Sequence, residues 1–166
     1  MQSYQGDHDI VKMMTVARMT LDTLFQLCTT TAIAGWLLLL ASPVTTTLAD
    51  RVSGLLIPTL LAILYAGLVM AFWTRAEGGF DSLSNVMRLF TKPEIALAGW
   101  IHYLAFDLFV GAWEVRTARE ERIPFILVVP CLLLTFLFGP AGYLAFTCLR
   151  AARAITPLAR FPSLRP

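Results

Sequence analysis

Long apolar runs separated by short polar and charged clusters dominate the chain. The runs cover residues 24–41, 52–73, 95–115 and 125–149. A helix needs about 20 apolar residues to cross the hydrocarbon core of a bilayer, at about 1.5 Å per residue. None of the runs alternates with the period of two that is typical of strands, and in lipid a helix satisfies its own backbone hydrogen bonds. The pattern therefore predicts an all-α integral membrane protein, a bundle of four spanning helices.

Three segments outside these runs have mixed polarity. Between residues 81 and 90, one helical face carries Leu83, Val86, Met87 and Phe90, which predicts a short interfacial helix between spanning helices two and three. Residues 1–23 carry a similar stripe, so we expect an amphipathic N-terminal segment before a transmembrane four-helix domain over residues 24–149. The basic, Pro-containing residues 150–166 predict a disordered tail.

The composition agrees with a membrane protein. Hydrophobic residues make up 57% of the chain and charged residues 14%, against about 45–50% and 25% in soluble domains. The net charge of +2 does not indicate nucleic-acid binding. The three cysteines lie singly in apolar runs without CxxC spacing, so we interpret them as core residues.

The basic residues suggest an orientation. With four crossings, nine basic residues share the side of both termini: Lys12, Arg18, Arg75, Arg88, Lys92, Arg150, Arg153, Arg160 and Arg165. The other side has four: Arg51, Arg116, Arg119 and Arg122. Cytoplasmic loops carry an excess of Lys and Arg, so this count favours both termini in the cytoplasm. The long polar leader before the first run argues against a cleaved signal peptide.

The third run contains the chain's most informative polar residues. His102 and Asp107 lie within it, each about 3–5 Å from its centre near Leu104. A carboxyl at the centre of a spanning helix costs about 2.5–3.5 kcal/mol, and such residues normally face the bundle interior. At about 100° per residue, Asp107 and His102 lie about 140° apart around the helix.

Two stripes of candidate ligand-binding residues follow from this geometry. Along one lie Trp100, Tyr103, Asp107, Gly111 and Glu114; along the other lie His102, Phe106 and Trp113. Gly111 would allow a ligand or a helix to approach closely. One intramembrane His and one Asp on different faces fall short of the three ligands that a metal site needs, so we expect no metal.

Structural interpretations of the same residues remain open. His102 could bond a carbonyl of a neighbouring helix. Asp107 could bond one of four side chains: Thr135, Tyr143, Thr59 or Tyr65. Glu114 could be a solvated charge at the helix end, and the aromatic rings could be packing alone. In the fourth run, Pro130 and Gly139-Pro140 predict a kink near Gly139, either as a packing feature or as the opening of a cavity.

Two segments resemble a known family. Residues 98–111, AGWIHYLAFDLFVG, resemble the core motif of the ABA4-like membrane proteins, and residues 138–144, FGPAGYL, resemble their second motif. Trp100, His102, Asp107 and Gly111 are the positions that match. The resemblance implies a small four-helix membrane protein related to the plant proteins required to form neoxanthin from violaxanthin. The plant-type leader is absent, so we expect a bacterial inner-membrane protein acting on another lipid-soluble compound.

Two functional hypotheses follow. The first is a cofactor-independent isomerase of carotenoid or isoprenoid metabolism, in which Asp107 delivers a proton, assisted by His102 or Tyr103. The second is a non-catalytic protein that binds a pigment or lipid, alone, as a homo-oligomer or with a membrane-protein partner. A channel or transporter ranks third, because the chain offers few charged pore positions. A lipid-accessible pocket containing Asp107 and His102 would favour the enzyme.

Overall fold

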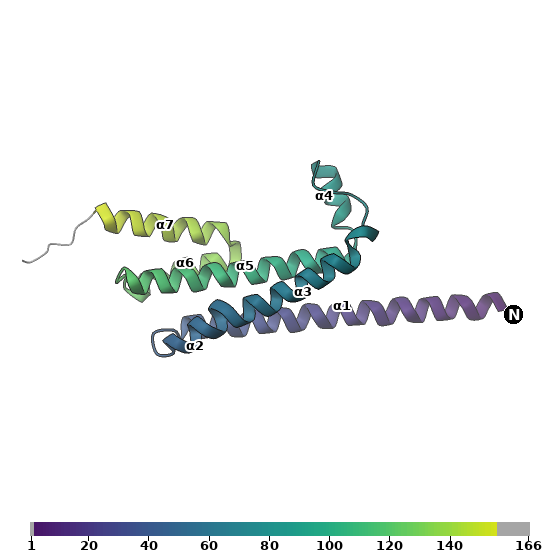
Figure 1. Ribbon diagram of the computed structural model, residues 1–166, viewed down its shortest axis with the longest axis horizontal. Helices are drawn as coiled ribbons and strands as arrows, with labels where there is room; N and C mark the ends of the chain where they lie inside the picture. The colour runs from purple at the N-terminus through teal and green to yellow at the C-terminus, as the bar shows by residue number, and fades with distance from the viewer. Residues whose placement is uncertain (1, 156–166) are drawn as a thin grey trace, which may run out of the picture.

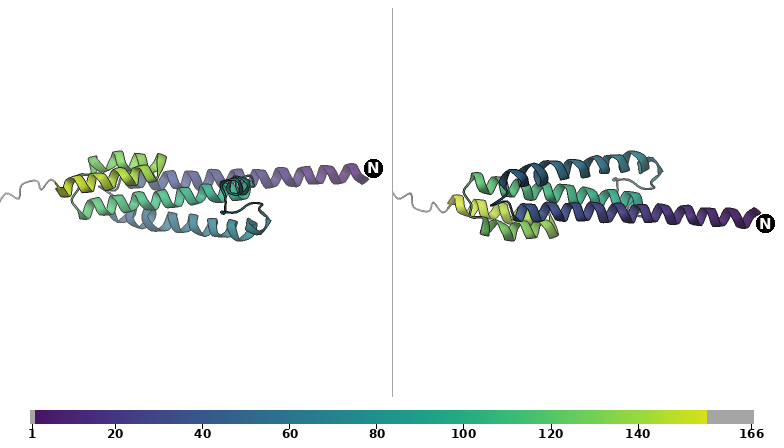
Figure 2. Two further views of the ribbon diagram at one scale, coloured as in Figure 1. Left: turned by 90° about the horizontal axis from the view of Figure 1, so that it is seen from above. Right: turned by 90° about the horizontal axis from the view of Figure 1, so that it is seen from below.

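The computed structural model describes the backbone of residues 2–155 and the side chains of residues 15, 16 and 18–155. Within these residues all regular structure is helical, which confirms the predicted all-α class. The long helices α1 (Gln2–Leu40) and α3 (Ile57–Phe72) both pack against α5 (Pro93–Glu120), as Figure 1 and Figure 2 show. In the described part of the chain, three segments are long and apolar enough to cross a membrane: Arg18–Leu40, Thr46–Arg75 and Pro93–Glu120.

The second of these segments has an irregular beginning. Helix α2 (Thr46–Arg51) leads through a π-helical turn, Val52–Leu56, into α3. Pro58 has no N–H to donate, and the preceding turn is wide: the N–H of Ile57 bonds the carbonyl of Val52, five residues back. The buried Ser53 hydroxyl donates to the Gly35 carbonyl at 2.8 Å, which fixes this turn against α1.

The prediction of one continuous spanning helix over residues 125–149 is wrong. The run forms two shorter helices, α6 (Phe125–Phe138) and α7 (Pro140–Ile155), and α7 runs back alongside α6 (Figure 1, Figure 2). Gly139 makes the turn with φ +38°, a conformation that favours glycine. Pro140 cannot donate the N–H that would continue α6. The kink expected near Gly139 is therefore a complete reversal of direction.

The hairpin α6–α7 changes the topology. The 14 residues of α6 extend about 21 Å at 1.5 Å each, short of the roughly 30 Å hydrocarbon core. The guanidinium of Arg150 on α7 bonds the carboxylate of Glu121 at the end of α5, with Nε at 3.0 and 2.9 Å from its oxygens. The beginning of α1 and the end of α7 thus lie at opposite ends of the molecule (Figure 1). The prediction that both termini share one side does not fit this arrangement.

The short helix predicted between the second and third spans is confirmed as α4 (Leu83–Leu89). The N–H of Asn85 bonds the Ser82 hydroxyl at the start of α4. Its axis runs across the long axis of the bundle (Figure 1). Leu83 and Met87 are 76% and 65% exposed. An apolar exposed face on a helix lying across the bundle fits the predicted position at the membrane surface.

The proposed segment boundaries at the two ends are less distinct in the structure. Helix α1 continues through residue 23 without a break. The side chains of residues 1–14, which carry part of the predicted amphipathic stripe, lie outside the described residues. In the predicted tail, residues 150–155 are helical as the end of α7, and residues 156–166 are not described.

Candidate functional site

Asp107 lies on the face of α5 that meets the α6–α7 turn. Its side chain is 9% exposed, and its Oδ2 atom has no hydrogen-bond partner among the described residues. A Cβ atom built on Gly139 would lie 2.6 Å from Oδ1, so only a residue without a side chain brings the turn this close. The backbone of the hairpin turn therefore lies directly against the carboxyl group.

A cavity of about 240 Å³ opens beside Asp107, between α1, α5 and the last turn of α6. Its lining is mostly apolar and aromatic, and it includes Trp36 and Leu104 as well as Asp107. Two of the predicted residues, Trp100 and Tyr103, also line it. The prediction that Asp107 faces the bundle interior and borders a cavity with Tyr103 agrees with this geometry.

Trp100 and Tyr103 are held by hydrogen bonds to other helices. The Trp100 indole N–H donates to the Thr29 hydroxyl of α1 at 3.0 Å, and the Trp100 ring stacks on Phe25 with centroids 5.4 Å apart. The Tyr103 hydroxyl donates to the Phe136 carbonyl of α6 at 3.0 Å. Tyr103 precedes Asp107 by four residues, about one helical turn, and so lies on the same face of α5. A carboxyl group, a phenol and an indole thus border one apolar cavity in fixed positions.

His102 points elsewhere. Its ring stacks on Phe106 with centroids 4.6 Å apart and lies 5.4 Å from the ring of Tyr65 on α3. Both His102 and Phe106 lie on the exposed side of α5 that meets α3, and neither lines the Asp107 cavity. Of the two residues that could border a cavity with Asp107, Tyr103 does so and His102 does not.

Glu114 is a second buried carboxyl on α5. The interpretation of Glu114 as a solvated helix-end charge is wrong: its side chain is 0% exposed, and α5 continues to Glu120. The Thr135 hydroxyl, one of the candidate partners for Asp107, donates instead to Glu114 Oε1 at 2.8 Å. Oε2 has no partner among the described residues. Glu114 lies outside the Asp107 cavity and joins α5 to α6.

Comparison with protein families gives a match over most of the chain. The family described as ABA4-like (ABA DEFICIENT 4-like) matches residues 23–146, which include the Asp107 cavity and the hairpin turn. The chain belongs to the ABA4-like family. No curated protein and no solved structure matches it.

Gly111, the last residue of the first family motif, and Trp113 pack the helices together. A Cβ atom on Gly111 would lie 2.6 Å from the Trp36 ring, so Gly111 allows α1 to approach α5. The Trp113 ring contacts Phe146 edge-on, with centroids 5.5 Å apart, and the Arg150 guanidinium lies 5.7 Å from its centroid. Neither residue borders the Asp107 cavity.

Sequence reasoning missed the cavity's walls on α1 and α6. Thr29, Trp36 and Phe136 come from other helices and lie outside both family motifs, so their sequence carried no signal for this site. Among the described residues, no three His, Cys, Asp or Glu side chains converge as a metal site would require.

Proposed function

We propose that this ABA4-like protein is a membrane-embedded isomerase that binds one end of a lipophilic isoprenoid, such as a carotenoid, in the Asp107 cavity. The observation that carries the proposal is a carboxyl group with an unpartnered oxygen in an apolar cavity beside Trp100 and Tyr103. A polar group inside a spanning helix raises the free energy of insertion, so such groups normally have a polar partner or a role in function. The family relation supports a carotenoid-type substrate.

The size of the cavity limits the bound part of the ligand. Its volume of about 240 Å³ is below the roughly 300–1,000 Å³ of complete small-molecule pockets. A ring or other end group fits this space, and the rest of the chain would lie in the bilayer. The exposed side chains of Ile33 and Leu137 at the cavity border provide an apolar route to the lipid.

The proposed reaction needs one acid that acts twice. For an epoxide, Asp107 would donate its proton to the ring oxygen as a carbon–oxygen bond breaks, and positive charge would develop on that carbon. The Asp107 carboxylate would then remove a proton from the next carbon, which forms the new double bond and restores the acid. The aromatic rings of Trp36 and Trp100, which border the cavity, would help to stabilise this positive charge. The proposal gives no proton to His102, which faces α3.

We also propose that three segments cross the membrane and that α6–α7 enters and leaves it on one side. The positive-inside count changes with this topology. Six described basic residues lie at the end that holds the α5–α6 loop: Arg51, Arg116, Arg119, Arg122, Arg150 and Arg153. Four lie at the other end: Arg18, Arg75, Arg88 and Lys92. The excess favours a cytoplasmic α5–α6 loop, in a bacterial inner membrane.

A second candidate function is a non-catalytic binder of pigment or lipid, alone or with a membrane-protein partner. The polar atoms of Trp100 and Tyr103 already bond Thr29 and Phe136, as interhelical hydrogen bonds in a scaffold would. In this alternative the cavity would hold a ligand without converting it.

The variant Asp107→Asn separates the two functions. Asn retains the shape and hydrogen bonding of Asp107 but cannot supply a proton. Wild-type protein in liposomes should convert an added epoxy-carotenoid to an isomer of equal mass, separated by chromatography. Asp107→Asn should remain folded, retain the carotenoid and lose conversion by at least about 100-fold, the lower range for general acid–base catalysis.

Two comparisons complete this experiment. Asp22→Asn, an exposed carboxyl on α1, should convert the carotenoid like the wild type. Asp107→Leu should both lose conversion and weaken the fold, because it removes polar contacts at the turn. Full activity of Asp107→Asn would exclude acid catalysis, and carotenoid retention without conversion by the wild type would support the binder.

A further inference from the structure

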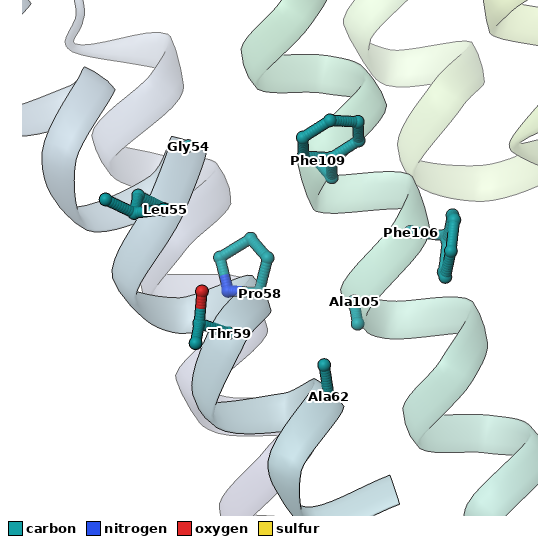
Figure 3. Close-up of a pocket in the computed structure, with 8 residues that line it drawn as sticks. All are labelled: Gly54, Leu55, Pro58, Thr59, Ala62, Ala105, Phe106 and Phe109. Atoms are coloured by element: carbon teal, nitrogen blue, oxygen red, sulfur yellow. The ribbon is translucent and has the colours of Figure 1, made fainter. Parts of the chain in front are cut away.

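A second cavity lies on the opposite side of α5 from Asp107, in a groove between α3 and α5. It has a volume of about 290 Å³. One wall carries Leu55, Pro58 and Ala62, and the other carries Ala105, Phe106 and Phe109 (Figure 3). Figure 3 shows small side chains facing each other across the groove and the Phe109 ring near one end. Thr59 is the one polar side chain in its lining. We call this the α3–α5 groove.

One end of the α3–α5 groove is basic. A Cβ atom on Gly54, which lines the groove, would lie 2.9 Å from Nη1 of Arg116. The guanidinium of Arg116 therefore lies over the π-helical turn that precedes α3. Arg51, which is exposed, lies about one turn before Leu55 on the same segment.

These two arginines have no acidic partner among the described residues. The nearby Asp50 carboxylate is occupied by Arg119, whose two terminal nitrogens donate to it at 3.0 and 2.7 Å. Arg51 and Arg116 are thus available for an anion at the membrane surface, beside an apolar groove.

The length of the groove matches one leaflet of a bilayer. From Arg116 to Ala105, eleven residues at 1.5 Å each give about 16 Å. Half of the roughly 30 Å hydrocarbon core is about 15 Å. A chain held in the groove would reach the bilayer centre while its head group stayed at the level of Arg116.

We propose that the α3–α5 groove binds an anionic phospholipid, with an acyl chain between α3 and α5 and the phosphate on Arg51 and Arg116. Arginine is suited to phosphate because its planar donors match two oxygens at once. The groove is separate from the Asp107 cavity, so this site does not depend on the isomerase proposal.

The test compares lipids in detergent solution. Phosphatidylglycerol at about one hundred times its dissociation constant should raise the melting temperature by roughly 5 °C more than equimolar phosphatidylcholine. Native mass spectrometry should show phosphatidylglycerol retained on the protein. The double variant Arg51→Gln and Arg116→Gln should lose this preference for phosphatidylglycerol. Arg122→Gln, at the same end but outside the groove, should keep it.

A further variant tests the acyl-chain part of the site. Ala62→Phe fills the groove and leaves both arginines, and it should also lose the phosphatidylglycerol preference. Equal stabilisation by the two lipids would overturn the proposal, as would a preference that survives the double arginine variant or Ala62→Phe. An equal shift with inorganic phosphate alone would overturn the lipid assignment. Dimerisation that phosphatidylglycerol does not reverse would assign the groove to a second copy of the chain.

Discussion

The turn at Gly139 can be tested by Gly139→Ala. The sign of the stability change depends on whether residues 125–149 form a hairpin or one continuous helix. In Gly139→Ala, a side chain must adopt φ +38° and its Cβ would lie 2.6 Å from Asp107 Oδ1. A conformation of this kind costs about 1–3 kcal/mol for a residue other than glycine. The Asp107 carboxyl can rotate away, so the backbone contributes most of the effect. We expect a loss of about 2 kcal/mol, which lowers the melting temperature by roughly 4–8 °C.

Gly67→Ala provides the matched control for this measurement. Gly67 lies in helix α3, and a Cβ atom there would meet nothing within 4 Å. Alanine in a helix is favoured over glycine by about 0.5–1 kcal/mol, so this variant should melt at the same or a higher temperature. When Asp107 is replaced by Ala, Gly139→Ala should destabilise the protein slightly less, because the contact with the carboxyl group is gone and the backbone cost remains. Melting temperatures of the wild type and of the four variants, purified in one detergent, give these comparisons.

If residues 125–149 formed one continuous spanning helix, Gly139→Ala would stabilise the protein as Gly67→Ala does. A melting temperature for Gly139→Ala equal to or above that of the wild type would therefore refute the hairpin.

Two further predictions concern the contacts that hold the hairpin. Thr135→Val removes the hydroxyl that donates to the fully buried Glu114, so it should lower the stability measured by thermal unfolding by about 1–3 kcal/mol. Thr135→Ser keeps the hydroxyl and should retain most of the stability. A Thr135→Val protein as stable as the wild type would contradict this hydrogen bond. The hydrogen bonds from Arg150 lower the pKa of Glu121 below its ordinary value of 4.5. Because the folded pKa is the lower one, this pair stabilises the protein above about pH 4.5 and less as the pH falls below it. The difference in melting temperature between wild type and Glu121→Gln should therefore shrink between pH 6 and pH 3, and a difference independent of pH would contradict the pairing.

The helices could be predicted because apolar length is a local property. Runs of about 20 apolar residues identify spanning helices without knowledge of their neighbours. The same rule produced the main error, since residues 125–149 are long enough to span but contain Gly139-Pro140. A proline removes one hydrogen bond and permits either a kink or a stop. Only the contact between Gly139 and Asp107, 32 positions apart, distinguishes these outcomes.

At the candidate site, too, the sequence predicted what depends on one helix and not what depends on its neighbours. Helical spacing correctly placed Asp107 and Tyr103 on one face and His102 on another, because the 100° rotation per residue is fixed by α5 itself. It could not show which face meets which helix. The burial of Glu114 was missed for this reason, since its partner Thr135 lies on α6. The orientation stays a prediction, because the positive-inside count depends on the number of crossings.

The central claim is that the Asp107 cavity holds the end of a lipophilic molecule. The most direct measurement is mass analysis of the lipids extracted from the purified protein and from two variants. Ile33→Trp fills the Asp107 cavity from α1, and Ile63→Trp adds the same ring at an exposed position of α3 that lines no described pocket. We predict an isoprenoid that co-purifies with the wild type and with Ile63→Trp and is absent from Ile33→Trp. An isoprenoid retained equally by all three proteins, or found with none of them, would contradict the claim.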